Sequence, residues 1–386
     1  MVSLLQPFTG YVPATEFARR VVGPPVSTLS PDQREAARLD PLSFRHVVGK
    51  GAGTSVEEAQ EWVRACNEQG VLRPVGPALL VYRLTHETTS VTGLIGEVSI
   101  AAYDSGLIKR HETTISRTEL KMARYMRKTR VYGNPVALAY RENDIVSKAI
   151  AARVSSEADY SFDAADGSKH HMWKIEGDAA ANICQQFRDE LYITDGHHRL
   201  AAASHVAAKE GRLDPHLPAG LFSSGELHLR SFARCVVDPG INTREIIARI
   251  REDHVLEPIS QLEIRPTERF EFGVELEGET YRLRIAPRLI PDDVYHSLDV
   301  NLLQDLILDP LFGITNPRND PRLRFIADQP GAEEDQIPCQ AWFLPYPASV
   351  ADVMTVADSG LAMPPKSTLF TPKLPSGLVI RELDKT

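Results

Sequence analysis

The stretch ELYITDGHHRLAAASHVAAKEG, residues 190–211, carries the pattern that decides the fold. Its apolar start LYIT (191–194) predicts a short buried strand, and the glycine of TDG predicts a tight turn. The alanine-rich run from Leu200 to Glu210 predicts a helix, because alanine has the highest helix propensity and Gly211 follows as a typical C-terminal cap. The stretch therefore predicts a strand, a glycine turn and a helix in succession.

This arrangement predicts a helix that begins with His197-His198-Arg199 and an anion-binding site at that end. The first N–H groups of a helix have no partner within it, and the helix dipole makes this end positive. Gly196 lets the backbone approach a phosphate closely, Arg199 can bind two oxygens at once, and His197 and His198 add imidazoles. The same phosphate would repel Asp195 unless Mg²⁺ or a substrate amine lay between them. We therefore expect a metal–nucleotide complex or an amino acid as ligand.

Two other interpretations of these residues stay open at this point. Asp195 can cap the helix while His197 and His198 are polar surface residues. A metal site made by the two adjacent histidines is disfavoured, since neighbouring side chains on a helix diverge by about 100°. We therefore assign no metal ligands from the sequence.

Composition limits the classes of protein to which the chain can belong. The 386 residues are 42% hydrophobic and 25% charged, which is a globular composition with enough length for two or three packed units. The net charge of -9 argues against bulk nucleic acid or an anionic membrane as the main partner, because either would favour a basic surface. We expect neither as a partner.

The cysteines and the N-terminal segment indicate the compartment. The four cysteines are far apart and form no CxxC pair, so we expect reduced thiols and neither a disulfide framework nor a structural zinc site; they are Cys66, Cys184, Cys235 and Cys339. The N-terminal residues lack the pattern of a signal peptide, and no run approaches the roughly 18 apolar residues of a membrane helix. We therefore expect a cytoplasmic protein.

Other segments predict a mixture of helices and strands without a regular βαβ spacing. Helices are predicted at 55–69, 145–156 and 349–360. Strands are predicted at 78–85, 91–100, 134–140 and 171–175. Residues 270–287 predict a hairpin that turns at Glu277 and Gly278.

The motif YITDGHHR (192–199) resembles the signature of the ParB/sulfiredoxin-like superfamily. The resemblance is to the form found in ADP-dependent free-serine kinases and in a widespread, uncharacterised bacterial family of ParB-like proteins. Further similar segments follow the same order along nearly the whole chain: DPLSFRHVV near residue 40, IKRHETT at 108–114, TRVYGNPVALAY, and PPKSTLFTPKLPSGLVIREL at the tail. Where many members have Pro-Pro-Tyr-Asp-Val, this chain has Pro24-Pro25-Val26-Ser27-Thr28, so the acceptor can differ from serine.

The resemblance to the serine kinases nominates the site residues. It implies that Glu112 is the base that activates the acceptor hydroxyl and that His111 orients Glu112 or contacts phosphate. Asp195 would contact the acceptor and the metal ion. The residues expected to hold the nucleotide phosphates are Gly196, His197, His198, Arg199, Lys366, Ser367 and Thr368.

The resemblance also implies an architecture of the α+β class. We expect a ParB/sulfiredoxin-like core at about residues 95–235 on an N-terminal α/β extension, which together form a nucleotide-binding domain of residues 1–235. A second α+β unit would follow at 236–386, with a tail that returns to the active site.

The function implied is that of a nucleotide-dependent kinase of small molecules. We expect a phosphotransferase with an alcohol acceptor that uses Mg²⁺ and either ATP or ADP, with free L-serine as acceptor and O-phosphoserine as product. The alternative is a ParB-like nucleotide-binding switch or DNA-associated protein without kinase activity. That alternative predicts a basic DNA-binding appendage, and this acidic sequence shows none. A sulfiredoxin-like enzyme would carry a cysteine in the phosphate motif, where His197 stands here.

Overall fold

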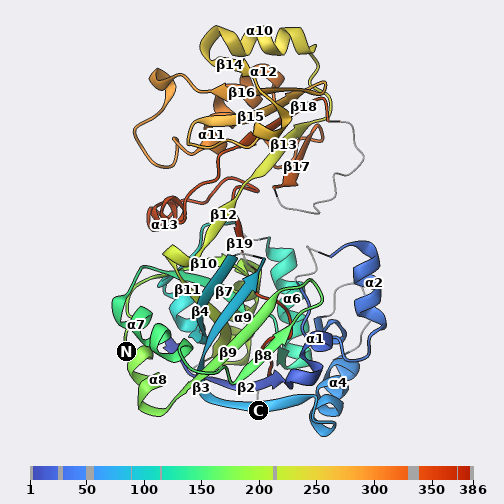
Figure 1. Ribbon diagram of the computed structural model, residues 1–386, viewed down its shortest axis with the longest axis vertical. Coiled ribbons are helices and arrows are strands. Elements are labelled where there is room, and N and C mark those ends of the chain that lie inside the picture. Colours follow the sequence, from blue (N-terminus) through green and yellow to red (C-terminus); the bar gives the residue numbers. More distant parts are fainter. Residues whose placement is uncertain are drawn as a thin grey trace. The chain divides into compact units, whose positions relative to one another are not determined.

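The chain forms two compact units in a computed structural model. The structure describes residues 3–24, 29–48, 56–87, 89–113, 115–211, 215–328, 339–371 and 373–382. The first unit contains the chain up to Leu227 together with the tail after residue 372, and the second unit is His228–Thr371. Figure 1 labels many of the helices and strands of both units.

A ten-stranded mixed sheet organises the first unit. Its strands, in spatial order, are β5 (Ile108–Lys109), β10 (Leu191–Asp195), β7 (Val136–Tyr140), β11 (His216–Ser223), β4 (Thr89–Ser99), β3 (Leu72–His86), β9 (Lys169–Glu176) and β8 (Tyr160–Asp163). Off this path, β1 (Leu5–Gln6) pairs with β4, and β2 (Phe8–Pro13) pairs with β3. Strands from the N-terminal segment thus belong to the same sheet as the strands around the DGHHR motif.

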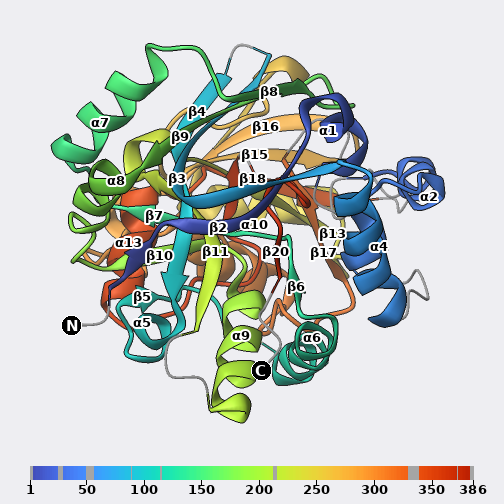
Figure 2. The same ribbon diagram turned by 90° about the horizontal axis from the view of Figure 1, so that it is seen from below.

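The helices of the first unit are α1 (Thr15–Val21), α2 (Pro31–Leu39), α3 (Arg45–Val48), α4 (Val56–Glu68), α5 (Ile100–Asp104), α6 (Ser116–Thr129), α7 (Asp144–Val154), α8 (Gly177–Cys184), α9 (His197–Glu210) and a 3₁₀ turn, η2 (Ser224–Glu226). Helices α5 to α9 share the main hydrophobic core of the first unit with this sheet, whereas α1, α3 and α4 contribute to a second, smaller core. Helix α9 packs beside α5 and α6, and Figure 2 shows α9 and α6 side by side. Leu200, Ala202 and Ala203 are buried, and the small alanines let α9 lie close to its neighbours.

Strand directions bring three loops together at one edge of this sheet. Strands β5 and β10 are parallel, with Leu191 opposite Ile108, so the residues after both strands emerge at the same edge. Strand β7 is antiparallel to β10, with Asp195 opposite Ala137, so the loop before β7 lies at that edge too. The candidate site is built from these three loops.

The tail of the chain crosses the first unit near the same loops. The Gly377 N–H donates a 2.7 Å hydrogen bond to the Gly133 carbonyl, just before β7. Strand β20 (Arg381–Glu382) then pairs with β6 (Val131–Tyr132). Arg381 forms an ion pair with Glu97, which is buried in β4. The tail is therefore an integral part of the first unit.

The second unit is built on a six-stranded antiparallel sheet. Its strands, in spatial order, are β14 (Val255–Pro258), β16 (Glu279–Arg284), β15 (Glu271–Leu276), β18 (Ala341–Pro345), β13 (Phe232–Val236) and β17 (Leu323–Ala327). The helices are α10 (Thr243–Asp253), α11 (Asp299–Leu303), α12 (Asp309–Phe312) and α13 (Val350–Asp358), with shorter turns η3 (Gln261–Glu263), η4 (Pro287–Leu289) and η5 (Gln304–Leu308). A separate two-stranded ribbon joins β12 (His228–Arg230) to β19 (Leu369–Thr371).

Most elements predicted from local pattern are confirmed. The hairpin turns where predicted, because Glu277 and Gly278 both have positive φ, at 51° and 86°, as a two-residue turn of this kind requires. The helix after the glycine turn begins at His197, as expected, and runs through the alanine-rich stretch to Glu210. The mixed α and β content expected from the sequence is also found. Among the described residues, no helix combines the length and the apolar character needed to cross a membrane.

The expectation of four reduced cysteines is wrong for one pair. Cys235 and Cys339 form a disulfide with a Cα–Cα distance of 5.5 Å. The two residues are 104 positions apart in sequence, but Cys235 lies in β13 and Cys339 just precedes the neighbouring β18. Only the pairing of these strands brings the two sulfurs together, so spacing in the sequence gave no sign of it. Cys66 and Cys184 are free and buried.

Candidate functional site

The glycine turn between β10 and α9 has the geometry that the sequence predicted. Gly196 has φ 106° and stands directly before the first residue of α9. A Cβ at this position would lie 2.8 Å from Val136 Cγ1 and 3.0 Å from Arg199 Nε. Positive φ and close packing together require glycine here.

The N-terminal end of α9 keeps donor groups for a ligand. The N–H groups of Arg199 and Leu200 both donate to the Gly196 carbonyl, over 2.8 and 3.0 Å. The N–H groups of the preceding residues therefore stand outside the hydrogen bonds of the helix, at its positive end. The His198 Nδ1 is buried and has no hydrogen-bond partner among the described residues. A ligand that accepts hydrogen bonds fits this end of the helix.

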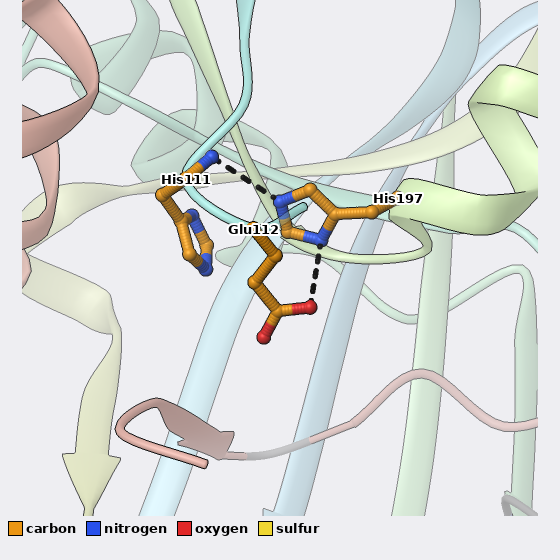
Figure 3. A group of neighbouring side chains, drawn as sticks. All are labelled: His111, Glu112 and His197. Carbon is orange, nitrogen blue, oxygen red and sulfur yellow. Dashed lines mark hydrogen bonds and ion pairs between the residues drawn. The ribbon is translucent and has the colours of Figure 1, made fainter. Parts of the chain in front are cut away.

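Three side chains gather beside this helix end, and we call them the His111–Glu112–His197 cluster (Figure 3). His111 and Glu112 follow β5, and His197 is the first residue of α9. The backbone N–H of His111 donates to His197 Nε2 over 3.5 Å, and His197 Nδ1 lies 3.5 Å from Glu112 Oε2. The two imidazole rings meet edge to face with centroids 4.5 Å apart. The parallel pairing of β5 with β10 produces this cluster.

Burial keeps both imidazoles of the cluster neutral. The pKa of His111 is lowered to about 4 by burial, and burial followed by the nearby His111 lowers the pKa of His197 well below its ordinary value. Because His197 Nε2 accepts the N–H of His111, its proton is on Nδ1 and points to the Glu112 carboxylate. Glu112 is half exposed, so its carboxylate is oriented from one side and open to solvent on another.

Asp195 lies between two cations at the same edge. Arg199 Nη2 forms an ion pair with Asp195, while Arg199 Nη1 donates to the carbonyls of Asn134 and Pro135 over 2.9 and 2.6 Å. Arg199 thus holds the loop before β7 and the end of β10 together, in addition to any part in phosphate binding. Lys373 Nζ lies 3.9 Å from Asp195 Oδ1.

Sequence reasoning missed Lys373, although it belongs to the tail segment that resembles the ParB-like proteins. Lys366, Ser367 and Thr368 lie in the second unit, in the turn before β19. The Lys366 ammonium stands 5.4 Å from the Phe232 ring centroid, and buried Ser367 donates to the Pro364 carbonyl over 2.7 Å. Of the differing segment at 24–28, residues 25–28 lie outside the described part of the chain.

Another buried histidine, His170 in β9, belongs to a separate polar network. Its Nδ1 lies 2.8 Å from the Tyr82 hydroxyl and its Nε2 lies 2.9 Å from Ser168 Oγ. Ser168 in turn donates to Asp166 over 2.6 Å. Burial lowers the pKa of His170 to about 4, although Asp166 opposes the shift. This network lies at the β8–β9 edge of the sheet, with Tyr82, Ser168 and His170 buried and Asp166 exposed.

The lowered pKa values of His111 and His170 predict that the fold loses stability in acid. His111 and His170 are neutral when folded and take up a proton near pH 6.5 when unfolded, so the unfolded state binds more protons between pH 6.5 and 4. Stability is therefore lost as the pH falls through this range, by up to about 3 kcal/mol for each residue. Urea unfolding should show a lower midpoint at pH 5 than at pH 7. His170→Gln should show a smaller difference; equal midpoints at both pH values in the unmodified protein would contradict this assignment.

The fold and the site define a mixed α/β protein with a histidine–carboxylate cluster at the N-terminal end of a helix. The chain belongs to the family described as Protein of unknown function (DUF1015), whose sequence profile matches residues 5–301. No curated protein matches it.

Several solved structures are similar to this chain at low identity. SbnI with a C-terminal truncation, from Staphylococcus aureus, is 10% identical, with a TM-score of 0.39 over 74% of this chain and 86% of the other. A mutant free serine kinase in complex with AMP is 13% identical, with a TM-score of 0.36 over 76% of this chain and 92% of the other. A complex of such a mutant kinase with ADP is 13% identical, with a TM-score of 0.36 over 75% of this chain and 91% of the other.

Proposed function

We propose that this protein is a nucleotide-dependent phosphotransferase that transfers a phosphoryl group from ATP or ADP to the hydroxyl of a small molecule. Free L-serine, giving O-phosphoserine, is the leading acceptor because of the motif resemblance. The observation that carries the proposal is that His197 is at once the first residue of α9 and the neighbour of Glu112, at 3.5 Å. A carboxylate base and an anion-binding helix end are therefore neighbours.

Glu112 is the general base of the proposed reaction. As the acceptor oxygen forms its new bond to phosphorus, the bond to the nucleotide oxygen breaks, and the hydroxyl proton passes to the Glu112 carboxylate. His197 donates its Nδ1–H to that carboxylate and so holds it in one orientation. Because His197 is neutral, it orients Glu112 without the strong fall in basicity that a cation would cause.

The helix end and Asp195 hold the nucleotide in this proposal. The N–H groups at Gly196, His197 and His198 bind phosphate oxygens. Asp195 offers the oxygen ligand that Mg²⁺ prefers, and Mg²⁺ when bound neutralises phosphate charge. Lys373, 3.9 Å from Asp195, keeps positive charge beside the same carboxylate. Arg199 positions Asp195 through their ion pair.

The resemblance also nominates three residues of the second unit as phosphate-binding residues. Lys366 supplies a cation, and Ser367 and Thr368 supply hydroxyl groups within one turn, which suits phosphate oxygens. Support for this part comes from the resemblance of the Pro365–Thr368 segment to the serine kinases. Replacing Lys366 with alanine tests it through nucleotide affinity.

Phosphorus NMR tests the proposal directly. Purified protein is incubated with Mg²⁺, either ATP or ADP, and a pool of free amino acids and small alcohols; a parallel sample contains a chelator. A new phosphomonoester signal that disappears with the chelator establishes the kinase, and dividing the pool identifies the acceptor. Nucleotide binding without a phosphoester from any pool would favour a binding switch, and absence of nucleotide binding would overturn the proposal.

A further inference from the structure

We infer that the His111–Glu112–His197 cluster is a binding site for a divalent transition-metal ion, with zinc as the ion. One ligand atom from each residue lies within 4.8 Å of the other two. Among the described histidines, cysteines and carboxylates, this is the one group of three that meets that condition. Binding of the metal is independent of the proposed function; only its effect on catalysis rests on that function.

The two imidazoles are held in place before any ion arrives. His111 is 1% exposed and His197 is 4% exposed, so the surrounding structure fixes both rings. Their edge-to-face contact restricts them further. Preorganised ligands lose little conformational entropy on binding, which favours affinity.

Glu112 makes the site open on one side. Its side chain is 49% exposed, in contrast to the two imidazoles. Three protein ligands with an accessible side are the arrangement of catalytic or exchangeable zinc sites, whereas structural zinc sites have four protein ligands. The ion would therefore keep a coordination position for water or another small ligand.

The donor atoms select against magnesium. Two imidazole nitrogens and one carboxylate oxygen suit zinc and other first-row transition metals, whereas Mg²⁺ prefers a shell made of oxygens. The ion of the cluster would therefore differ from the Mg²⁺ that accompanies a nucleotide at Asp195. The two metals would occupy chemically different sites.

His197 cannot bind a metal ion and orient Glu112 at the same time. His197 Nδ1 is the atom that lies 3.5 Å from Glu112, and it cannot donate a proton and coordinate an ion at once. When Nδ1 coordinates the ion, the proton of the His197 ring moves to Nε2. There it faces the N–H of His111, 3.5 Å away, and the hydrogen bond between the two residues is lost. That bond is at the outer limit of length, so losing it costs at most about tenfold in affinity. Zinc would thus bind and would block the use of Glu112 as a base.

The test is a zinc titration of the full-length protein after metal removal, in competition with a chromophoric chelator. We expect one tight equivalent, weakened more than about 100-fold by His197→Gln and more than about tenfold by Glu112→Gln. Co²⁺ should give the intense visible bands of a four- or five-coordinate ion. The matched control is His205→Gln, because His205 pairs with Glu119 at 3.2 Å outside the cluster. It should bind zinc unchanged.

Several outcomes would overturn the inference. Equal zinc affinity in the unmodified protein and in Glu112→Gln would overturn it. This variant should fold normally, because Glu112 is half exposed. Absence of a tightly bound equivalent of zinc would overturn it as well. In the phosphorus NMR assay, one equivalent of zinc should abolish phosphoester formation, and undiminished turnover with zinc bound would refute the mutual exclusion. If no turnover is found under any condition, the kinase proposal fails while the titration still decides the metal site.

Discussion

Glu112→Gln is expected to lower turnover by at least about 100-fold while nucleotide affinity stays nearly unchanged. The amide has the shape of the carboxylate, and its oxygen can still accept the Nδ1–H of His197, 3.5 Å away in the parent protein. It cannot take up the proton of the acceptor hydroxyl. Initial rates from phosphorus NMR and nucleotide titration by calorimetry measure the two effects separately.

The control for this prediction is Glu119→Gln. Glu119 also pairs with a histidine, His205, but it lies in α6 and outside the cluster. Its replacement should leave turnover unchanged. Undiminished turnover in Glu112→Gln would remove Glu112 from the mechanism, and a parallel loss of nucleotide affinity would show that it binds rather than reacts.

Gly196→Ala is expected to abolish nucleotide binding and to destabilise the fold by about 1–3 kcal/mol. The new Cβ would stand 2.8 Å from Val136 and 3.0 Å from Arg199, with φ at 106°. Relief of the clash requires buried Val136 in β7 to shift and Arg199 to give way slightly, which strains its hydrogen bonds to the loop before β7. Urea unfolding and nucleotide titration measure the two losses.

Gly211→Ala provides the matched control, because it lies at the other end of the same helix. Gly211 has φ 62°, but a Cβ there would meet no atom within 4 Å. We expect a cost of only about 1 kcal/mol and unchanged nucleotide binding. If both variants bind nucleotide equally well, the turn at Gly196 is not part of the binding site.

Local pattern was sufficient to predict the elements around the motif. Alternation, apolar runs and turn residues act over a few positions, so β7, β10 and the hairpin at Glu277 could be read from the sequence. The helix after the glycine turn was expected to begin with His197-His198-Arg199, and α9 does begin at His197. The helix begins at His197 because the Gly196 carbonyl already accepts the N–H groups of Arg199 and Leu200.

The cluster itself depends on pairing that the sequence does not encode locally. His111 and His197 are 86 positions apart and meet because β5, a strand of two residues, runs parallel to β10. A strand this short has no period to detect. The contact of Lys373 with Asp195 and the Cys235–Cys339 disulfide could not be predicted from local pattern either, because each joins segments that are far apart in the chain.

The ion pair of Arg381 with Glu97 has a consequence for synthesis on the ribosome. Glu97 is 1% exposed and belongs to a strand made early, whereas Arg381 is made after the whole second unit. Gln6 and the Thr9 N–H can donate to Glu97 from the start. The buried carboxylate gains its cation only when Arg381 is made, so the packing of the early segment is less stable until then. Lys373 reaches Asp195 at the same late stage. A chain released before these residues are added would therefore have a less stable first unit and an incomplete site.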